Sequence, residues 1–256
     1  MTGDPTDTPV IVTAGDGFFV RQAIDNMGWC DMGDYVLVVD ALEDAPLEDE
    51  VMDAIAETTG GKPVKYVLNT HSHYDHVALN GAFVERFGAE IVNQRTTTVD
   101  PSGRLFEGAD RKVWMIPMPG CHTREDCVIW APDDRVLFVG DIFGWGLIPS
   151  GGLLDAKLRH LLRETYQHLI DFEARVVVPG HGPVCGTPEL IRWAEYFDWL
   201  LETAGGLVAD GKSDDEIKRT VTPPENMLDW WRFVAWKHAD ALSKVLMSAR
   251  RGALDA

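Results

Sequence analysis

Three of the eight histidines in this 256-residue chain fall within six residues. Residues 71–76 read HSHYDH and follow the apolar run 66–68, which we expect to be a strand. The motif therefore lies in a loop at the carboxyl end of a strand, where α/β folds place ligands. In an extended loop, His71 and His73 point to one side and can bind one ion. The side chains of Asp75 and His76 point in other directions and can bind a second ion.

Three further side chains of the same kinds follow other apolar runs: His122, Asp141 and His181. Each stands just past a glycine at an expected strand end, where the backbone can bend toward a shared centre. A single histidine or aspartate in such a place is usually a turn residue. Four such features in one chain are hard to explain separately. Together they supply five histidines and two aspartates, enough for two metal ions with an open position on each.

The elements that must position these side chains alternate between strands and helices. Strands are expected at residues 10–13, 18–20, 35–39, 64–68, 91–93, 113–117, 127–130, 136–139 and 175–178. Helices are expected from the acidic stretch 43–50 to residue 59, and at 81–87, 153–172, 187–204, 213–216 and 222–251. Thr187 is the expected N-cap of its helix, which Gly205 and Gly206 should end.

This order of elements predicts an α/β (α+β) protein with a single domain over residues 1–256. Its core should span about residues 10–185, and a C-terminal helical part about residues 186–256.

The charge balance excludes several kinds of partner. Lysine and arginine number 23 and aspartate and glutamate 41, so the formal net charge is −18. Such an acidic chain repels a phosphate backbone and an anionic membrane, which argues against nucleic-acid and membrane partners. The acidic start has no apolar leader segment, and no run is long enough for a membrane helix. With four cysteines and no CxxC pair, these features predict a cytoplasmic protein with reduced thiols.

In their order and spacing, the motifs resemble those of the metallo-β-lactamase superfamily. The resemblance covers about residues 10–185 and rests on HSHYDH at 71–76, PGCHT at 119–123, GD at 140–141 and PGHG at 179–182. It implies a four-layer αβ/βα sandwich with metal ions at one edge and extra C-terminal helices. It implies that one ion is bound by His71, His73 and His122. It implies that the second is bound by Asp75, His76 and His181, with Asp141 bridging the two ions.

Some residues depart from particular branches of this superfamily. True β-lactamases that share the pattern of residues 119–130 carry cysteine where this chain has Asp141, and they lack a histidine at the position of His76. Lactonases that open acyl-homoserine lactones carry a tyrosine three residues after the bridging aspartate, where this chain has Gly144. The resemblance therefore favours the glyoxalase II and lactonase side of the superfamily.

The resemblance implies a hydrolase with two divalent metal ions, of which zinc is expected first and iron or manganese are alternatives. Metal binding lowers the pKa of water to about 7, so a hydroxide held between two ions is a nucleophile at neutral pH. The expected substrate is a small carbonyl compound: an ester, a lactone or a thioester, in that order. Asp75 is the expected catalytic residue, because a metal-bound carboxylate can also carry a proton to the leaving group.

Other functions stay open at this point. Superfamily members with a single iron oxidise glutathione persulfide and use only the equivalents of His71, His122 and Asp141. β-Lactam hydrolysis is a further alternative, and phosphodiester cleavage is disfavoured by the net charge of −18. A further alternative is a binding module without catalysis, and the seven candidate ligands argue against it, because such a module does not need open positions on its metal ions.

Residues around the motifs have less direct interpretations. Thr70, Thr123 and Asp40 are candidates to orient the imidazoles. Five of the nine tryptophans fall in the C-terminal part and could line an apolar substrate pocket or serve helix packing, including a homodimer face. They are Trp193, Trp199, Trp230, Trp231 and Trp236. The remaining histidines are expected on the surface or in packing: His160, His168 and His238.

Overall fold

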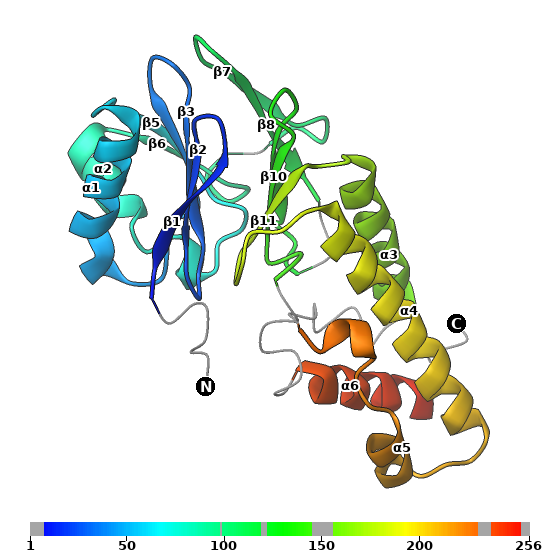
Figure 1. The fold of residues 1–256 in the computed structure, drawn as a ribbon. Coiled ribbons are helices and arrows are strands. Elements are labelled where there is room, and N and C mark those ends of the chain that lie inside the picture. The colour runs from blue at the N-terminus through cyan, green and yellow to red at the C-terminus, as the bar shows by residue number, and fades with distance from the viewer. Residues whose placement is uncertain (1–7, 98, 119–121, 145–155, 230–236, 252–256) are drawn as a thin grey trace.

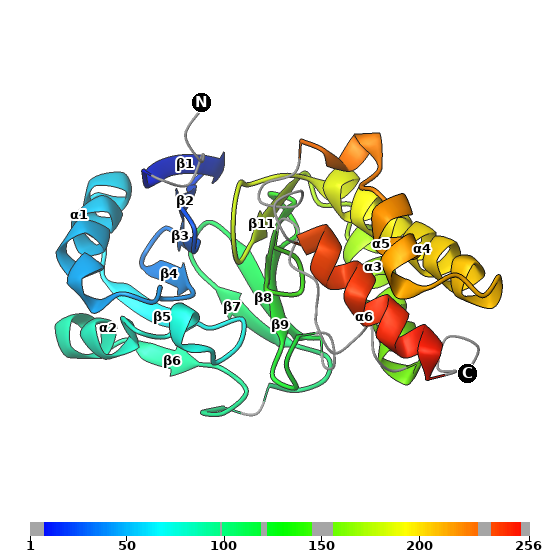
Figure 2. The same ribbon diagram turned by 90° about the horizontal axis from the view of Figure 1, so that it is seen from below.

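The computed structural model describes residues 8–97, 99–118, 122–144, 156–229 and 237–251 of the chain. In these residues two β-sheets lie face to face, and helices cover the outer side of each sheet (Figure 1, Figure 2). The layers follow one another as helices, sheet, sheet and helices, which confirms the predicted four-layer αβ/βα fold. Within the described residues, no helix combines the length and apolar composition needed to cross a membrane.

The described part of the first sheet has six strands that pair in chain order. They are β1 (Val10–Gly15), β2 (Phe18–Gln22), β3 (Met27–Asp31), β4 (Val36–Val39), β5 (Val64–Leu68) and β6 (Glu90–Val92). The first four strands are antiparallel neighbours, whereas β4, β5 and β6 run parallel. Every residue of β4 is buried, because both faces of this inner strand are covered.

The second sheet has the order β11-β10-β9-β8-β7. Its strands are β7 (Arg104–Glu107), β8 (Lys112–Pro117), β9 (Cys127–Ala131), β10 (Val136–Gly140) and β11 (Val176–Pro179). Strands β7 to β10 are antiparallel, and β11 is parallel to β10. The carboxyl ends of β10 and β11 therefore lie at the same edge of this sheet.

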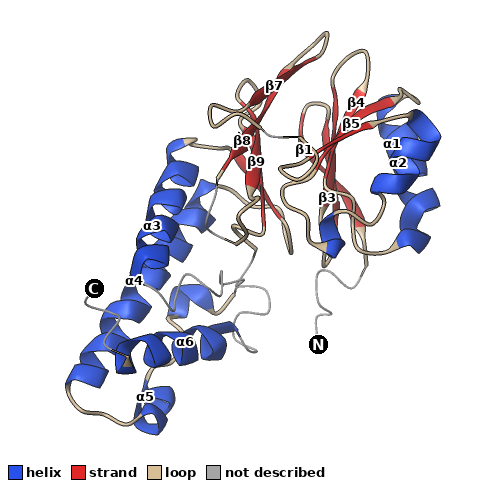
Figure 3. Cartoon of the chain, turned by 180° about the vertical axis from the view of Figure 1, so that it is seen from behind, coloured by secondary structure: helices blue, strands red, loops and turns tan. Residues whose placement is uncertain are grey.

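Helices α1 (Glu48–Thr59) and α2 (Asn80–Phe87) cover the first sheet, as Figure 3 shows from behind. Helices α3 (Ala156–Asp171) and α4 (Thr187–Ala209) cover the second sheet, and α5 (Asp214–Thr220) and α6 (His238–Arg250) pack on α4. Short 3-10 turns occupy Ala45–Leu47, Tyr74–His76 and Glu225–Met227.

Clusters of buried apolar side chains hold these layers together. The cluster between the sheets contains Leu37 and Phe138. The cluster behind the second sheet joins Leu137 of β10, Trp193 of α4 and Leu246 of α6. The C-terminal helices therefore share a core with the second sheet. A single domain over residues 1–256 stays a prediction, and this shared core favours it.

Two helix boundaries differ from the sequence-based expectation. Helix α1 begins at Glu48, after a 3-10 turn that contains Pro46, so only the end of the acidic stretch 43–50 belongs to the helix. Helix α4 has Gly186 as its N-cap in place of Thr187 and continues through Gly205 and Gly206 to Ala209. A glycine inside a helix costs only about 1 kcal/mol, so the burial of one face outweighs it.

The C-terminal region and two strands also differ from expectation. Because Pro223 and Pro224 cannot donate backbone hydrogen bonds, residues 222–224 are not helical, so residues 222–251 do not form one continuous helix. Strands β3 and β7 were not expected. In β3, Gly28 weakens the pattern of a strand, yet a Cβ there would lie 2.1 Å from Phe138 Cε1 of the second sheet. The close approach of the two sheets therefore requires this glycine.

Candidate metal centre

The structure brings together all seven side chains that the sequence singled out. They stand in loops that follow β5, β8, β10 and β11, at the edge where the two sheets meet. His71, His73, His122 and Asp141 form one group, and Asp75, His76, Asp141 and His181 form another. In each group the ligand atoms lie within 4.8 Å of one another. Asp141 belongs to both groups.

The first group has the dimensions of a small tetrahedral metal site. His73 Nδ1 lies 3.0 Å from His71 Nε2 and 3.0 Å from His122 Nε2. Asp141 Oδ2 lies 3.5 Å from His122 Nε2 and 4.0 Å from His71 Nε2. A tetrahedral ion with bonds of about 2.0 Å separates its ligand atoms by about 3.3 Å. These four atoms are therefore spaced to surround one cation.

The second group uses the other oxygen of the shared carboxylate. Asp141 Oδ1 lies 3.2 Å from His181 Nε2 and 3.3 Å from His76 Nε2. Asp75 Oδ2 lies 3.5 Å from His181 Nε2 and 3.7 Å from His76 Nε2. Asp141 Oδ1 therefore faces the second group, whereas Oδ2 lies between the groups, 3.3 Å from His181 Nε2 and 3.5 Å from His122 Nε2.

Two atoms of this centre are buried without a hydrogen-bond partner among the described residues: His76 Nε2 and Asp141 Oδ1. An unpaired buried polar atom costs about 1–3 kcal/mol, and a cation between these atoms would pair both. A Cβ at Gly180 would lie 2.1 Å from Asp141 Oδ1, so only glycine leaves room for this carboxylate. The residues present therefore fit divalent cations.

Burial and charge set the protonation of the centre. Burial, aided by the nearby His76, lowers the pKa of His71 to about 2, so this imidazole is neutral and can donate a lone pair. Burial alone would raise the pKa of Asp141, but its interactions with the nearby His181 and His76 hold that pKa well below its usual range. Burial opposes protonation of His181, yet bonds to Asp141 and Asp25 raise its pKa to about 10. A cation in the second group would therefore displace a proton.

Two of the three residues expected to orient imidazoles do contact them. Asp40 Oδ2 lies 3.0 Å from His76 Nδ1, and Thr70 Oγ1 lies 3.2 Å from His71 Nδ1. Thr70 also donates from its backbone N to Asp40 Oδ1 at 2.7 Å. Asp40 has a φ of +60°, a strained backbone conformation that these bonds hold in place.

The third candidate, Thr123, acts differently from the expectation. Its hydroxyl donates to Asp126 Oδ1 at 2.6 Å, and Asp126 Oδ2 accepts from the backbone N of His122 at 2.7 Å. Asp126 is 3% exposed and fixes the backbone of the His122 loop. Sequence reasoning missed this residue, although its place four residues after a candidate ligand was a usable signal.

Sequence reasoning also missed the turn between β2 and β3. Asp25 Oδ1 lies 2.9 Å from His181 Nδ1. The neighbouring Asn26 donates through Nδ2 to the carbonyl groups of Pro179 at 2.8 Å and Gly182 at 2.7 Å. A turn of the first sheet therefore holds the loop of the second sheet that carries His181.

The other residues noted in the sequence lie away from this centre. Trp193 is buried in the core behind the second sheet, and Trp199 packs against the same core, so packing explains both. His160 and His168 are exposed on α3, whereas His238 is buried against Tyr196. Trp230, Trp231 and Trp236 lie outside the described residues.

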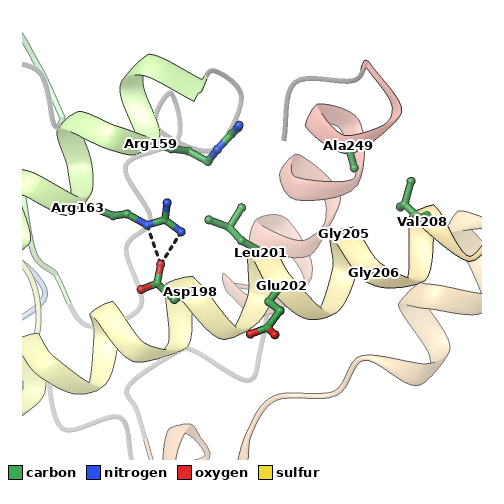
Figure 4. Close-up of a pocket in the computed structure, with 10 residues that line it drawn as sticks. Arg159, Arg163, Asp198, Leu201, Glu202, Gly205, Gly206, Val208 and Ala249 are labelled. Atoms are coloured by element: carbon green, nitrogen blue, oxygen red, sulfur yellow. Dashed lines mark hydrogen bonds and ion pairs between the residues drawn. The ribbon is translucent and has the colours of Figure 1, made fainter. Parts of the chain in front are cut away.

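A hollow of about 630 Å³ lies between α3, α4 and α6 (Figure 4). Arg163 forms an ion pair with Asp198 on one wall, and Arg159 donates to Ser248 Oγ at 2.8 Å. The hollow is lined by helix residues and shares none of the seven side chains of the metal centre. We therefore place the functional site at the edge of the two sheets.

The fold and this edge site define a four-layer αβ/βα protein with grouped metal-ligand side chains. The family model described as metallo-beta-lactamase superfamily matches residues 31–107 and 97–181, together more than half of the chain. The chain belongs to the metallo-beta-lactamase superfamily.

Relatives with known names match part of the chain. A hydroxyacylglutathione hydrolase of Rhizobium meliloti (strain 1021) is 34% identical over 106 residues, which are 38% of this chain and 40% of the relative. A probable hydroxyacylglutathione hydrolase of Schizosaccharomyces pombe is 26% identical over 191 residues, which are 65% of this chain and 70% of the relative. The chain therefore spans less than half the length of the bacterial relative.

Solved structures share the fold at low identity. A metallo-beta-lactamase family protein from Thermus thermophilus is 20% identical with a TM-score of 0.62, covering 93% of this chain and 94% of its own. A sec-alkylsulfatase from Pseudomonas sp. is 14% identical with a TM-score of 0.69, covering 97% of this chain and 51% of its own. Because these matches cover nearly the whole chain, they include the C-terminal helices.

Proposed function

We propose that this protein is a metal-dependent hydrolase whose two ligand groups hold two divalent cations. The observation that carries the proposal is the position of Asp141 between the groups: its carboxylate oxygens lie 3.2–3.5 Å from His76 and His181 of one group and His122 of the other. A carboxylate shared in this way can hold two adjacent cations.

Divalent cations bound there would lower the pKa of water and polarise a substrate carbonyl group. The protein's part is to hold the ligands and move a proton. His71, His73 and His122 would hold one cation, and Asp75, His76 and His181 the other, with Asp141 shared between them. Asp75 is the expected proton carrier, because its side chain is 17% exposed and can reach the substrate side, whereas Asp141 is 6% exposed.

A thioester is the substrate class that the relatives favour, because the sequence relatives quoted above are named hydroxyacylglutathione hydrolases. We therefore place thioesters ahead of esters and lactones, whereas the sequence placed thioesters last. Hydrolysis of a thioester breaks the carbon–sulfur bond, forms a carbon–oxygen bond from water and delivers one proton to the sulfur. A small-molecule substrate, the cytoplasmic location and a homodimer stay predictions.

The test combines metal content with turnover. Purified protein is reconstituted separately with zinc, iron and manganese, its metal content is measured by mass spectrometry, and hydrolysis of S-lactoylglutathione, phenyl acetate and a γ-lactone is followed. We expect about two cations per chain and thioester hydrolysis that a chelator abolishes. Asp141→Ala should lose both cations, whereas Asp133→Ala, in an exposed turn, should retain them.

The stoichiometry also separates the alternatives. Folded protein that retains almost no cation would contradict the hydrolase. One iron per chain, retained after the substitution Asp75→Ala, would favour the mononuclear iron oxidoreductase. Turnover of nitrocefin without thioester hydrolysis would favour a β-lactamase.

A further inference from the structure

The segment after β6 is tied to the histidine motif through its backbone. Asn93 accepts hydrogen bonds from the backbone N of Arg95 and of Thr96, each at 3.0 Å. The side chain of Asn93 donates to Asn69 Oδ1 at 3.1 Å. Asn69 in turn donates to the carbonyl oxygen of His76 at 2.9 Å. Two asparagines therefore connect the position of Arg95 to the loop that carries the ligands.

The side chain of Arg95 is tied to the same motif by a second route. Its Nε donates to Glu125 Oε1 at 2.8 Å. The other oxygen of Glu125 accepts a short hydrogen bond from the hydroxyl of Ser72. Ser72 stands between His71 and His73 in the chain. One side chain, the carboxylate of Glu125, therefore bridges the guanidinium and the histidine motif.

This arginine is exposed even though its position is fixed. Its side chain is 67% exposed, and within the described residues its guanidinium donates only through Nε. The terminal nitrogens remain for a ligand. An exposed ion pair contributes about 0–1 kcal/mol, so stability alone does not account for bonds to both backbone and side chain. In a chain of net charge −18, a fixed exposed cation connected through Glu125 and Ser72 to the histidine motif is a distinct feature.

We propose that Arg95 determines specificity by binding a carboxylate on the substrate, and that Glu125 positions its guanidinium. This proposal rests on the proposed hydrolase function and names its substrate class: thioesters with a carboxylate a few bonds from the scissile carbonyl. A planar guanidinium binds a carboxylate through paired hydrogen bonds, and a local cation offsets the repulsion that an acidic protein exerts on an anionic substrate.

The test compares two thioesters that differ only in charge: S-acetyl-3-mercaptopropionate and its amide, S-acetyl-3-mercaptopropionamide. In the cation-loaded enzyme, Arg95→Gln should raise the KM for the carboxylate about tenfold, the effect of losing one charged contact. The KM for the amide and kcat for both substrates should stay within about twofold. Arg124→Gln is the matched control, because it removes the same charge from an exposed residue next to Glu125.

A binding measurement decides the proposal independently of turnover. 3-(Methylthio)propionate cannot be hydrolysed, and its affinity is measured by NMR titration against that of 3-(methylthio)propionamide. We expect the wild-type protein to favour the carboxylate and Arg95→Gln to remove this preference. An equal loss for carboxylate and amide, or an equal effect of Arg124→Gln, overturns the proposal. If Arg95-dependent binding persists while neither thioester is hydrolysed, the hydrolase function fails and the anion site remains.

Discussion

At the scale of single residues, each imidazole of the second ligand group is held by a carboxylate at its far nitrogen. Asp40 contacts His76 Nδ1 at 3.0 Å, and Asp25 contacts His181 Nδ1 at 2.9 Å. A carboxylate at Nδ1 keeps the proton on that nitrogen, so Nε2 presents its lone pair to a cation. The orientation of both imidazoles is therefore set before any cation binds.

The substitution Asp25→Ala tests this arrangement. We expect the affinity of the second group for zinc to fall about 10- to 100-fold, because His181 loses the charged one of its two acceptors at Nδ1 and keeps only the carbonyl oxygen of Ile24 at 2.9 Å. The affinity of the first group should stay unchanged. Competition with a chromophoric chelator resolves the two binding steps. Asp44→Ala, an exposed aspartate just before the first 3-10 turn, is the control. Equal zinc affinities in wild type and Asp25→Ala would contradict the positioning role.

The seven candidate ligands could be predicted from sequence, whereas Asp25 could not. The ligands are dense in one motif and repeat one pattern, a histidine or aspartate after a strand and a glycine. Asp25 lies 156 residues from His181 and belongs to an ordinary turn. Only the packing of the first sheet on the second brings the two together, and pairings between sheets leave no local pattern in a sequence.

At the scale of elements, helix α4 contains two glycines, and packing does not require a glycine at one of them, Gly206. A Cβ at Gly206 would meet no heavy atom within 4 Å, and this residue lies in the helix at a negative φ. Gly206→Ala should therefore raise the free energy of unfolding by about 0.5–1 kcal/mol. Urea denaturation measures the change. The opposite result is expected for Gly180→Ala, where the new Cβ would collide with Asp141.

The contact between α4 and α6 should make stability depend on pH. His238 Nε2 lies 3.0 Å from the carbonyl oxygen of Val221, so Nε2 carries the proton and Nδ1 accepts from Tyr196 Oη at 2.9 Å. Burial lowers the pKa of His238, and the bond to Val221 opposes this only in part. As pH falls below about 6.5, the unfolded chain binds a proton here before the folded protein does. Stability contributed by His238 is therefore complete above this pH and is lost below it.

The expected measurement is the free energy of unfolding in urea at pH 7.5 and pH 5.5. Wild type should lose more stability between these conditions than His238→Gln, by at most about 1.4 kcal/mol per pH unit. His168→Gln, which removes an exposed imidazole from α3, should behave like wild type. Identical pH dependence in wild type and His238→Gln would show that this contact does not couple folding to protonation.

The elements themselves were predictable where a local pattern decided them. Strand β4 and strand β10 are continuous apolar runs, and Ser213 with Glu216 forms the expected capping box of α5. The errors occurred where packing overrode local preference. Helix α4 passes through two glycines because one of its faces is buried, and β3 tolerates Gly28 because Phe138 fills that space.

At the scale of the whole molecule, the excess of acidic residues links cation binding at the metal centre to the stability of the folded chain. Acidic residues exceed basic residues by 41 to 23, and four aspartates gather around the two ligand groups. They are Asp25, Asp40, Asp75 and Asp141. Without cations these carboxylates rely on protonated imidazoles for compensation, as the raised pKa of His181 to about 10 illustrates. Cations that bind only the folded chain therefore stabilise it.

Removing the cations should lower the melting temperature by roughly 10 °C, because saturation at about a thousand times Kd contributes about 4 kcal/mol to a protein of this size. Scanning calorimetry with zinc, and then with a chelator, measures the shift. General screening of an acidic chain would also raise the melting temperature, so sodium chloride at equal ionic strength is the necessary comparison. Asp141→Ala should remove the response to zinc and keep the response to sodium chloride. If zinc still stabilises this variant as strongly as wild type, the cations act on the surface charge and not through the shared carboxylate.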